Sequence, residues 1–330
     1  CHFYWTSMNL RKILYFIFKR NPDYWMKDEE GNQLPYLDGM EFIFLSDSTA
    51  QVEALRGGQV DYLIYLPSEF VPVLEEDPDI EVYRRPSNTA YVLRMRSDRG
   101  PASDVRVRQA LKLGTDRAAI LEGAVGGLGV TGRDTPIGPM YGDFYLDVPE
   151  LERDVEKAKE LLAEAGYGEG ELKITLHTQE SSPVPAIATI WQEQMAEIGV
   201  EVEIQRVPSD VYYGAENMWL EVDFAITDWG SRCYPQPYLD QAYVTGAPWN
   251  ESHWSDPELD ELAAAAAKEM DHETRVQLYH DIQRIFMERG PVIIPFFMEN
   301  MWGARSNLKG LRPTVTWGTA LDLRWVYFED

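Results

Sequence analysis

The sequence has few cysteines, few basic residues and no long apolar segment. Its two cysteines, Cys1 and Cys233, allow at most one disulfide bond, which excludes a disulfide framework and a cysteine-based zinc site. No run of about 18 apolar residues occurs, so no transmembrane helix is expected. The 55 Asp and Glu residues outnumber the 30 Lys and Arg residues, giving a net charge of −25. So acidic a chain is poorly suited to bind nucleic acid or an anionic membrane surface.

Motifs of the common catalytic and metal-binding classes are also missing. There is no G-x-S-x-G nucleophile elbow and no G-x-x-x-x-G-K-[ST] phosphate loop. His272 and Glu273 are followed by Val276 where an H-E-x-x-H zinc motif needs its second histidine. His272 and His280 lie two helical turns apart, too far for one small ion. The sequence predicts no cofactor and no metal, and it isolates no carboxylate pair for glycoside hydrolysis.

One glycine pattern matches a cofactor motif literally. Residues 127–132 read G-x-G-x-x-G, the pattern of a dinucleotide-binding loop. That loop needs a strand before it and a helix after it, because the helix N-terminus holds the pyrophosphate. Here a predicted helix precedes the pattern and Arg133-Asp134-Thr135-Pro136 follows it. We therefore interpret residues 123–132 as a flexible loop.

The remaining sequence is that of a globular α/β protein. Its 330 residues, 45% hydrophobic and 12% aromatic, correspond to about two domains. Residues 172–205 read as strand, helix and strand, which predicts a parallel pair with a right-handed crossover. Further predicted strands cover 40–45, 62–65, 80–83, 90–95, 222–227 and 292–297. Predicted helices cover 48–56, 154–165, 185–198, 257–268 and 273–289, and two more are capped by Asp104 and Thr115.

A loop of unusual composition follows the predicted strand 222–227. It contains a Trp, an Arg, two Tyr and two Pro, and spans residues 228–239. Ligands in open α/β sheets bind beyond the carboxyl ends of the strands. Apolar walls with a few fixed polar groups are typical of a small-molecule pocket, so we expect this loop to form one. The alternative is a surface loop whose Trp229 covers the core.

Four segments resemble one protein family. They are 18–25 (F-K-R-N-P-D-Y-W), 55–61 (L-R-G-G-Q-V-D), 104–111 (D-V-R-V-R-Q-A-L) and 158–166 (A-K-E-L-L-A-E-A-G). Each resembles a motif of the family 5 extracellular solute-binding proteins of ABC importers, the dipeptide, oligopeptide and nickel-binding group. The resemblance extends from residue 18 to about residue 310, and the motifs occur in the same order as in the family. Taken together, they are therefore a specific match to it.

The resemblance implies an α/β clamshell of the type II periplasmic-binding-protein class with a truncated first lobe. Residues 17–90 and 298–330 would be the remnant of the first lobe, 91–297 the second lobe, and 1–16 an atypical N-terminal segment. We expect a monomeric C-terminal fragment without enzymatic activity or cofactor. It would bind a solute in the cleft between the lobes and deliver it to the permease subunits. It would act in the periplasm or at the outer face of the cell, touching the membrane only through the permease or a lipid anchor that the sequence does not show.

The resemblance also implies which residues contact the solute. Peptide-binding members carry a Trp and, three residues later, an Asp that pairs with the peptide ammonium. Trp229 is retained here, but Arg232 stands at the acid position. A guanidinium suits a carboxylate or phosphate, so a peptide-like or anionic solute is expected, with Asp228 available to compensate. The predicted ligand-binding residues are Asp228, Trp229, Gly230, Arg232, Tyr234, Asn88 and Tyr91.

Three other functions stay open at this point. Trp229, Trp249 and Trp254 suit stacking on sugar rings, so the chain is also compatible with an oligosaccharide-binding protein of the same family. A hydrolase acting in the same cleft is a second alternative. A truncated product that binds no solute is the third.

Overall fold

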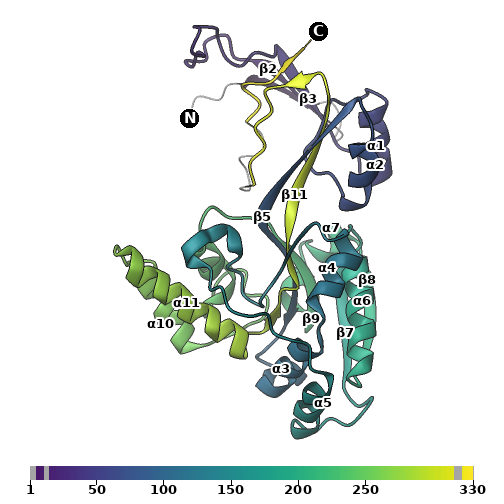
Figure 1. Cartoon of the computed structure of the whole chain (residues 1–330), viewed down its shortest axis with the longest axis vertical. Helices are drawn as coiled ribbons and strands as arrows, with labels where there is room; N and C mark the ends of the chain where they lie inside the picture. Colours follow the sequence, from purple (N-terminus) through teal and green to yellow (C-terminus); the bar gives the residue numbers. More distant parts are fainter. Residues whose placement is uncertain (1–4, 11–14, 316–321, 330) are drawn as a thin grey trace. The chain divides into compact units, whose positions relative to one another are not determined.

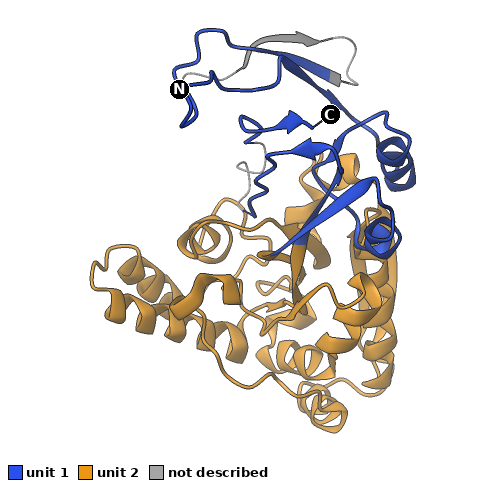
Figure 2. Ribbon diagram, turned by 45° about the horizontal axis from the view of Figure 1, so that its top comes forward, with its two compact units in different colours: residues 1–85, 300–330 blue, residues 86–299 orange. Residues whose placement is uncertain are grey.

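The chain divides into two units that share two long strands. Unit 1 comprises residues 1–85 and 300–330, and unit 2 comprises residues 86–299 (Figure 2). Strands β5 (Ile80–Met95) and β11 (Phe296–Arg305) each carry the chain from one unit into the other. The computed structural model describes residues 5–10, 15–315 and 322–329. The two strands predicted at 80–83 and 90–95 are one, because residues 84–89 between them, which are polar apart from Pro86, keep the extended backbone.

Unit 2 is a sheet covered by helices (Figure 1). Its other strands are β6 (Gly129–Thr131), β7 (Lys173–Gln179), β8 (Glu201–Val207), β9 (Phe224–Trp229) and β10 (Val292–Ile293). Its α-helices are α3 (Val105–Gly114), α4 (Arg117–Val125), α5 (Val155–Glu164), α6 (Val184–Glu197), α7 (Ser209–Tyr212), α8 (Met218–Glu221), α9 (Gln236–Tyr238), α10 (Pro257–Ala266) and α11 (His272–Arg289). Short 3-10 or π turns are η3 (Pro101–Ser103), η4 (Pro139–Phe144) and η5 (Leu239–Tyr243).

The central strands of unit 2 follow the order β5-β9-β7-β8. β7 is parallel to β8 over its whole length and parallel to β9, whereas β5 is antiparallel to β9. The predicted strand–helix–strand unit is therefore confirmed as β7, α6 and β8, with its two strands parallel. β6 pairs with β11, and β10 pairs with β5.

Alternating side chains bury both faces of this sheet. On one face Leu93 and Ile226 belong to an apolar cluster that α3, α4, α5 and α6 complete, with Trp191 fully buried in it. On the other face Val92 and Trp229 belong to a cluster formed with η5, α10 and α11. Burial on both faces is what a sheet sandwiched between helices requires, and the α/β class predicted from the sequence is confirmed.

Aspartate side chains begin most of the long helices. Asp104 caps α3 and Asp154 caps α5, each accepting a hydrogen bond from a backbone N–H of the first turn. The prediction that Thr115 caps the next helix is wrong by one residue, because Asp116 accepts from the backbone N–H of Ala119. The Thr115 hydroxyl instead donates to the carbonyl of Leu111 at the end of α3.

Unit 1 contains a small antiparallel sheet and two short helices. Its elements are β1 (Trp5–Leu10), β2 (Tyr15–Arg20), β3 (Gly39–Ile43), α1 (Ser48–Arg56), β4 (Tyr62–Leu63), η2 (Ser68–Phe70), α2 (Val71–Glu75), β12 (Leu308–Lys309) and β13 (Tyr327–Phe328). β2 lies between β1 and β3, and β4 pairs with the end of β11. β3 and β4 border an apolar groove of about 1050 Å³, and the neighbouring Phe44 and Tyr65 are exposed.

Candidate functional site

Three strands of unit 2 end at one edge of its sheet. β7 ends at Gln179, β8 at Val207 and β9 at Trp229, and all three run in the same direction. β5 runs the opposite way and places Tyr91 opposite Asp228. The edge at the carboxyl ends of parallel strands is where α/β sheets bind ligands. The structure therefore brings together residues of β5 and β9 that the sequence predicts to contact a solute.

Trp229 lies beneath this edge and is only 6% exposed. Its ring packs against Tyr238, Tyr243 and Trp249, with centroid distances of 5.9, 6.5 and 6.0 Å. Its indole Nε1 donates a hydrogen bond of 3.0 Å to Oε1 of Glu251. Asp228 and Trp229 also belong to β9 itself, since that strand begins and ends two residues later than predicted. The indole thus supports the loop from below, and its contact with a solute stays a prediction.

The carboxylate of Glu251 is part of a buried polar network. Its Oε2 accepts a 2.6 Å hydrogen bond from the Thr227 hydroxyl and lies 3.4 Å from Nε of Arg94. Burial raises the pKa of Glu251, whereas the nearby Arg94 guanidinium and the two hydrogen bonds act to lower it. Arg94 also donates to the carbonyls of Trp219, at 2.7 Å, and of Val222. The network therefore ties β5 and β9 to helix α8.

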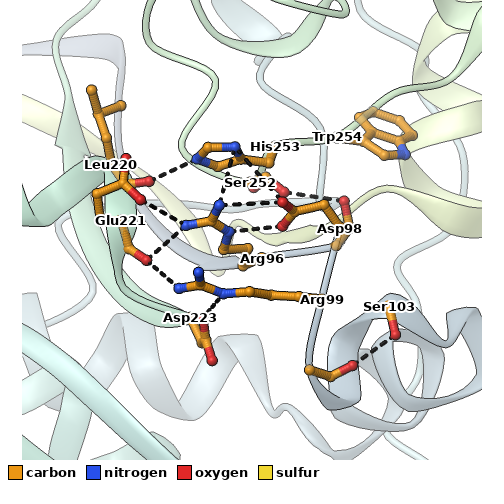
Figure 3. Close-up of polar contacts among 12 residues, drawn as sticks. Arg96, Asp98, Arg99, Ser103, Leu220, Glu221, Asp223, Ser252, His253 and Trp254 are labelled. Carbon is orange, nitrogen blue, oxygen red and sulfur yellow. Dashed lines mark hydrogen bonds and ion pairs between the residues drawn. The ribbon is translucent and has the colours of Figure 1, made fainter.

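Cationic and imidazole groups hold helix α8 by its carbonyl oxygens, as Figure 3 shows. The Glu221 carbonyl accepts from Arg96 at 2.8 Å and from Arg99 at 2.7 Å. The Leu220 carbonyl lies 3.0 Å from Nε2 of His253. The last turn of a helix leaves such carbonyls without partners within the helix, and these side chains satisfy them. The position of α8, and of the Trp219 that it carries, is thereby fixed.

Arg232 stacks on the aromatic residues of the same loop. Its guanidinium carbon lies 5.8 Å from the ring centroid of Trp229 and 6.0 Å from that of Tyr238. These distances are those of cation–π contacts, which orient the planar guanidinium. The indole and the guanidinium that the sequence places three residues apart are thus in contact at the edge of the sheet.

The loop that carries Arg232 is held by neighbouring polar groups. The Tyr238 hydroxyl donates to the carbonyl of Gly230 at 3.0 Å and accepts from the backbone N–H of Arg232 at 3.1 Å. The backbone N–H of Asn88 donates to the hydroxyl of Ser231 at 3.3 Å. Asn88 is almost fully buried, and its backbone N–H anchors the loop through Ser231. Such fixed backbone geometry is what a pre-organised binding site requires.

Asp228 differs from the other residues of β9 because it is exposed, whereas they are buried. Its Oδ1 accepts hydrogen bonds from the Gln179 amide at 2.7 Å and from the Tyr213 hydroxyl at 2.8 Å. Burial and the adjacent Asp228 charge both raise the pKa of Tyr213. Tyr91, opposite Asp228 in the ladder, is half-buried, and its ring lies 6.2 Å from that of Phe296.

Tyr234 lies in a separate aromatic group. Its ring packs against Phe144 at 5.2 Å and Tyr279 at 6.0 Å, and the Arg275 guanidinium lies 5.7 Å from its centroid. Phe144 ends η4, and the other two residues belong to α11. The described contacts of Tyr234 thus connect the loop to α11 and do not include Arg232.

Four residues that shape this edge were not identified from the sequence. They are Gln179, Tyr213, Tyr238 and Glu251. Gln179 carries a usable signal, because it is a polar residue at the carboxyl end of a predicted parallel strand. Glu251 carries none, since it lies 22 residues beyond Trp229 in a segment without a motif.

The glycine pattern at 127–132 has a packing explanation. A Cβ on Gly129 would lie 2.4 Å from the carbonyl oxygen of Phe297, and a Cβ on Gly132 would lie 2.0 Å from that of Ile294. Both glycines belong to or adjoin β6, which pairs with β11. The interpretation of 123–132 as a flexible loop is therefore wrong, because the segment contains the end of α4 and a paired strand.

Two further observations concern metal binding and membrane-spanning helices. Within residues 5–10, 15–315 and 322–329, no group of three or more His, Cys, Asp or Glu side chains is arranged to hold a metal ion. Those ranges also contain no helix with the length and apolar character needed to span a bilayer. His272 and His280 lie on α11, and both contact Asp143.

Comparison with known proteins places the chain in a family. Residues 4–251 match the model of the bacterial extracellular solute-binding proteins, family 5. The chain belongs to this family. The family 5 resemblance seen in the sequence motifs is thereby confirmed.

Curated family 5 relatives include the glutathione-binding protein GsiB of Salmonella typhimurium. It is 25% identical to this chain over 319 residues, which cover 93% of this chain and 59% of GsiB. GsiB of Escherichia coli strain K12 is 24% identical over the same length. The chain therefore spans about three fifths of the length of these relatives.

Solved family structures share the fold. DppA from Helicobacter pylori, in complex with the peptide STSA, superposes with a TM-score of 0.85 at 23% identity and is covered to 63% of its length. AgaA from A. tumefaciens R10, in complex with agropinic acid, gives a TM-score of 0.86 at 23% identity and is covered to 67%. Both comparisons include 99% of this chain. The predicted periplasmic-binding-protein fold is confirmed.

Proposed function

We propose that this chain is the solute-binding component of an ABC importer and binds a peptide-like or anionic small solute. Unit 2 corresponds in this proposal to the second lobe and unit 1 to part of the first. The solute is bound without chemical change and passed to the permease at the outer face of the membrane. The observation that carries the proposal is the Arg232 guanidinium, stacked on Trp229 and Tyr238 at the carboxyl ends of the strands.

The chemistry of Arg232 supports an anionic group on the solute. A planar guanidinium donates two parallel hydrogen bonds to a carboxylate, and stacking on aromatic rings holds it ready to do so. Ser231 and Tyr238 fix the backbone on either side, so little conformational entropy is lost on binding. Glutathione and agropinic acid, named with the relatives above, both carry carboxylates.

The tryptophans support the peptide-like solute over an oligosaccharide. Sugar binding needs an accessible aromatic face, and Trp229 and Trp254 are both buried in the core of unit 2. Trp249 is 40% exposed, but one ring alone provides a small stacking surface. A charged, hydrogen-bonding solute can form an ion pair with Arg232, whereas a neutral oligosaccharide cannot.

Isothermal titration calorimetry with a panel of solutes tests the proposal. The panel contains glutathione, the peptide Ser-Thr-Ser-Ala, agropinic acid and a neutral oligosaccharide such as maltotriose. We expect at least one of the first three to bind and to be recovered unchanged after prolonged incubation. Binding of maltotriose alone would favour the oligosaccharide function, and chemical conversion of a bound solute would favour a hydrolase. Binding of none would contradict the proposal.

A further inference from the structure

We propose that Glu251 is a positioning residue for solute binding, and that proton uptake by its carboxylate lowers the affinity of the site for its solute. The inference rests on the proposed function and adds a regulation by pH to it. Three observations carry it. The contacts of the carboxylate fit its charged form, they support the candidate site by two routes, and a pair of hydroxyl groups beside it can accommodate a proton.

The carboxylate of Glu251 is held as an acceptor. Oε1 accepts a hydrogen bond of 3.0 Å from the indole Nε1 of Trp229, and Oε2 accepts one of 2.6 Å from the Thr227 hydroxyl. Nε of Arg94 lies 3.4 Å from Oε2, and both charged side chains are almost completely buried. An ionised carboxylate accepts at both oxygens, whereas the protonated form must donate from one of them. Proton uptake must therefore change at least one of these contacts.

Glu251 supports the candidate site by two routes. The first is direct, because the ring of Trp229 that it holds carries the Arg232 guanidinium at 5.8 Å. The second passes through Arg94, which donates to the carbonyl of Trp219 in α8 at 2.7 Å. A neutral carboxyl is a weaker acceptor for the indole and leaves the buried Arg94 without its counter-charge. Proton uptake thus loosens both the support beneath Arg232 and the attachment of α8.

Two hydroxyl groups beside the carboxylate make room for a proton. Oγ1 of Thr227 lies 3.1 Å from the Tyr212 hydroxyl, which lies 3.4 Å from the carbonyl oxygen of Ile226. Because a hydroxyl can both donate and accept, Thr227 can turn to accept from a protonated Glu251 and donate to Tyr212. The Tyr212 hydroxyl then donates to the Ile226 carbonyl. The fold can therefore hold Glu251 in either charge state without leaving the added proton unpaired.

Burial and nearby charges set the pH at which Glu251 takes up a proton. Burial is the largest effect and raises the pKa of Glu251, as does the charge of Asp228 on β9. Arg94 on β5 and the two hydrogen bonds act in the opposite direction, and the net result is a raised pKa. Proton uptake therefore begins at a higher pH than in an exposed glutamate. The loss of affinity should develop as the pH falls through this raised pKa.

The other titratable neighbours stay neutral or act only on Arg94. Three tyrosines interact electrostatically with the carboxylate: Tyr212 in α7, Tyr213 directly after it and Tyr243 in η5. Burial raises the pKa of each of them, so all three are neutral at and below pH 7. His177 on β7 interacts with Arg94, and burial lowers its pKa. Glu251 is thus the group of this network that changes charge in mildly acidic solution.

Solute affinity measured as a function of pH tests the coupling. The probe is whichever of glutathione, Ser-Thr-Ser-Ala and agropinic acid the wild type binds, and titration calorimetry covers about pH 7 to pH 4.5, where α-carboxylates stay ionised. We expect the affinity of the wild type to fall about fivefold or more over this range. Glu251→Gln imitates the protonated carboxyl. It should bind about fivefold more weakly than the wild type at pH 7 and lose most of the pH dependence.

The indole resonance of Trp229 provides a readout that needs no solute. Its N–H donates to Glu251, so its NMR chemical shift should follow the charge of that carboxylate. Trp229→Phe identifies this resonance among those of the ten tryptophans. We expect the resonance to move with pH in the wild type, with the midpoint of the affinity curve, and to stay in place in Glu251→Gln. Glu258→Gln, which alters an exposed acid paired with Arg289, should behave as the wild type in both measurements.

The possible results separate this role of Glu251 from the proposed function. An affinity that does not change with pH, or a pH dependence that persists in Glu251→Gln, would refute the role of Glu251 while the proposed function stood. His177 and His253 are unaltered in that variant, so a pH dependence caused by a histidine would persist. If circular dichroism showed Glu251→Gln to be unfolded, unequal midpoints of affinity and indole shift in the wild type would refute the role. If no probe bound the wild type at any pH, the proposed function would fail, and this regulation with it.

Discussion

The indole nitrogen of Trp229 donates a hydrogen bond to the buried carboxylate of Glu251, 3.0 Å away and 22 residues further along the chain. Through Glu251 the candidate site is connected to Arg94 on β5, and through Arg94 to helix α8. The exposed edge that carries Arg232 and Asp228 thus rests on a buried ionic network. The geometry of this exposed edge therefore depends on buried side chains.

Replacing Glu251 by Gln should destabilise the protein by about 3 kcal/mol, because it leaves the buried Arg94 guanidinium without a counter-charge. Denaturant unfolding at pH 7 would measure this loss. Glu258→Gln is the matched control, since Glu258 is exposed and pairs with Arg289 at the surface. The control should cost less than about 1 kcal/mol. Equal losses for the two variants would contradict the role given to Glu251.

Replacing Tyr238 by Phe should loosen the loop that carries Arg232. The variant loses the hydroxyl that accepts from the Arg232 N–H and donates to the Gly230 carbonyl. We expect a loss of about 1 kcal/mol in unfolding free energy and faster hydrogen exchange at the Arg232 amide. Tyr279→Phe removes a hydroxyl bonded to Gln236 instead and should leave that amide protected. Unchanged exchange at Arg232 in Tyr238→Phe would show that the hydroxyl does not hold the loop.

Replacing Gly132 by Ala should disturb the pairing of β6. The new Cβ would lie 2.0 Å from the carbonyl oxygen of Ile294, which the backbone must move to avoid. We expect a cost of about 1–3 kcal/mol, visible as a lower midpoint of thermal unfolding. Gly168→Ala is the control, because its Cβ would meet only the flexible side chain of Glu171. A stable Gly132→Ala protein would revive the flexible-loop interpretation of this segment.

Elements with strong local signals were well predicted from the sequence. The helix at 48–56 matches α1 at both ends, and the strand–helix–strand unit at 172–205 matches β7, α6 and β8. Asp104 and Asp154 cap their helices as expected. These features depend on hydrophobic periodicity and on capping residues a few positions apart, and such local patterns can be read from a single sequence.

Features that depend on distant partners were predicted poorly. Gly129 in β6 and the adjacent Gly132 are explained by the close approach of the backbone carbonyls of Phe297 in β11 and of Ile294 just before it, more than 160 residues away, which no local pattern reveals. The strand-end rule located residues 228–232 correctly as an edge, but not that Trp229 turns inward to Glu251. Nor could it show that Gln179 and Tyr213 converge on Asp228, since the three residues belong to separate segments.

The affinity of the Arg232→Gln variant for whichever of glutathione, Ser-Thr-Ser-Ala and agropinic acid the wild type binds, measured by titration calorimetry, tests the solute-binding role of this edge most directly. Arg275→Gln is the matched control, because Arg275 also stacks on two rings, those of Phe144 and Tyr234. We expect Arg232→Gln to bind that solute at least tenfold more weakly than the wild type, and Arg275→Gln to bind it as the wild type does. An affinity for that solute that is unaltered in Arg232→Gln would show that this guanidinium does not recognise the solute.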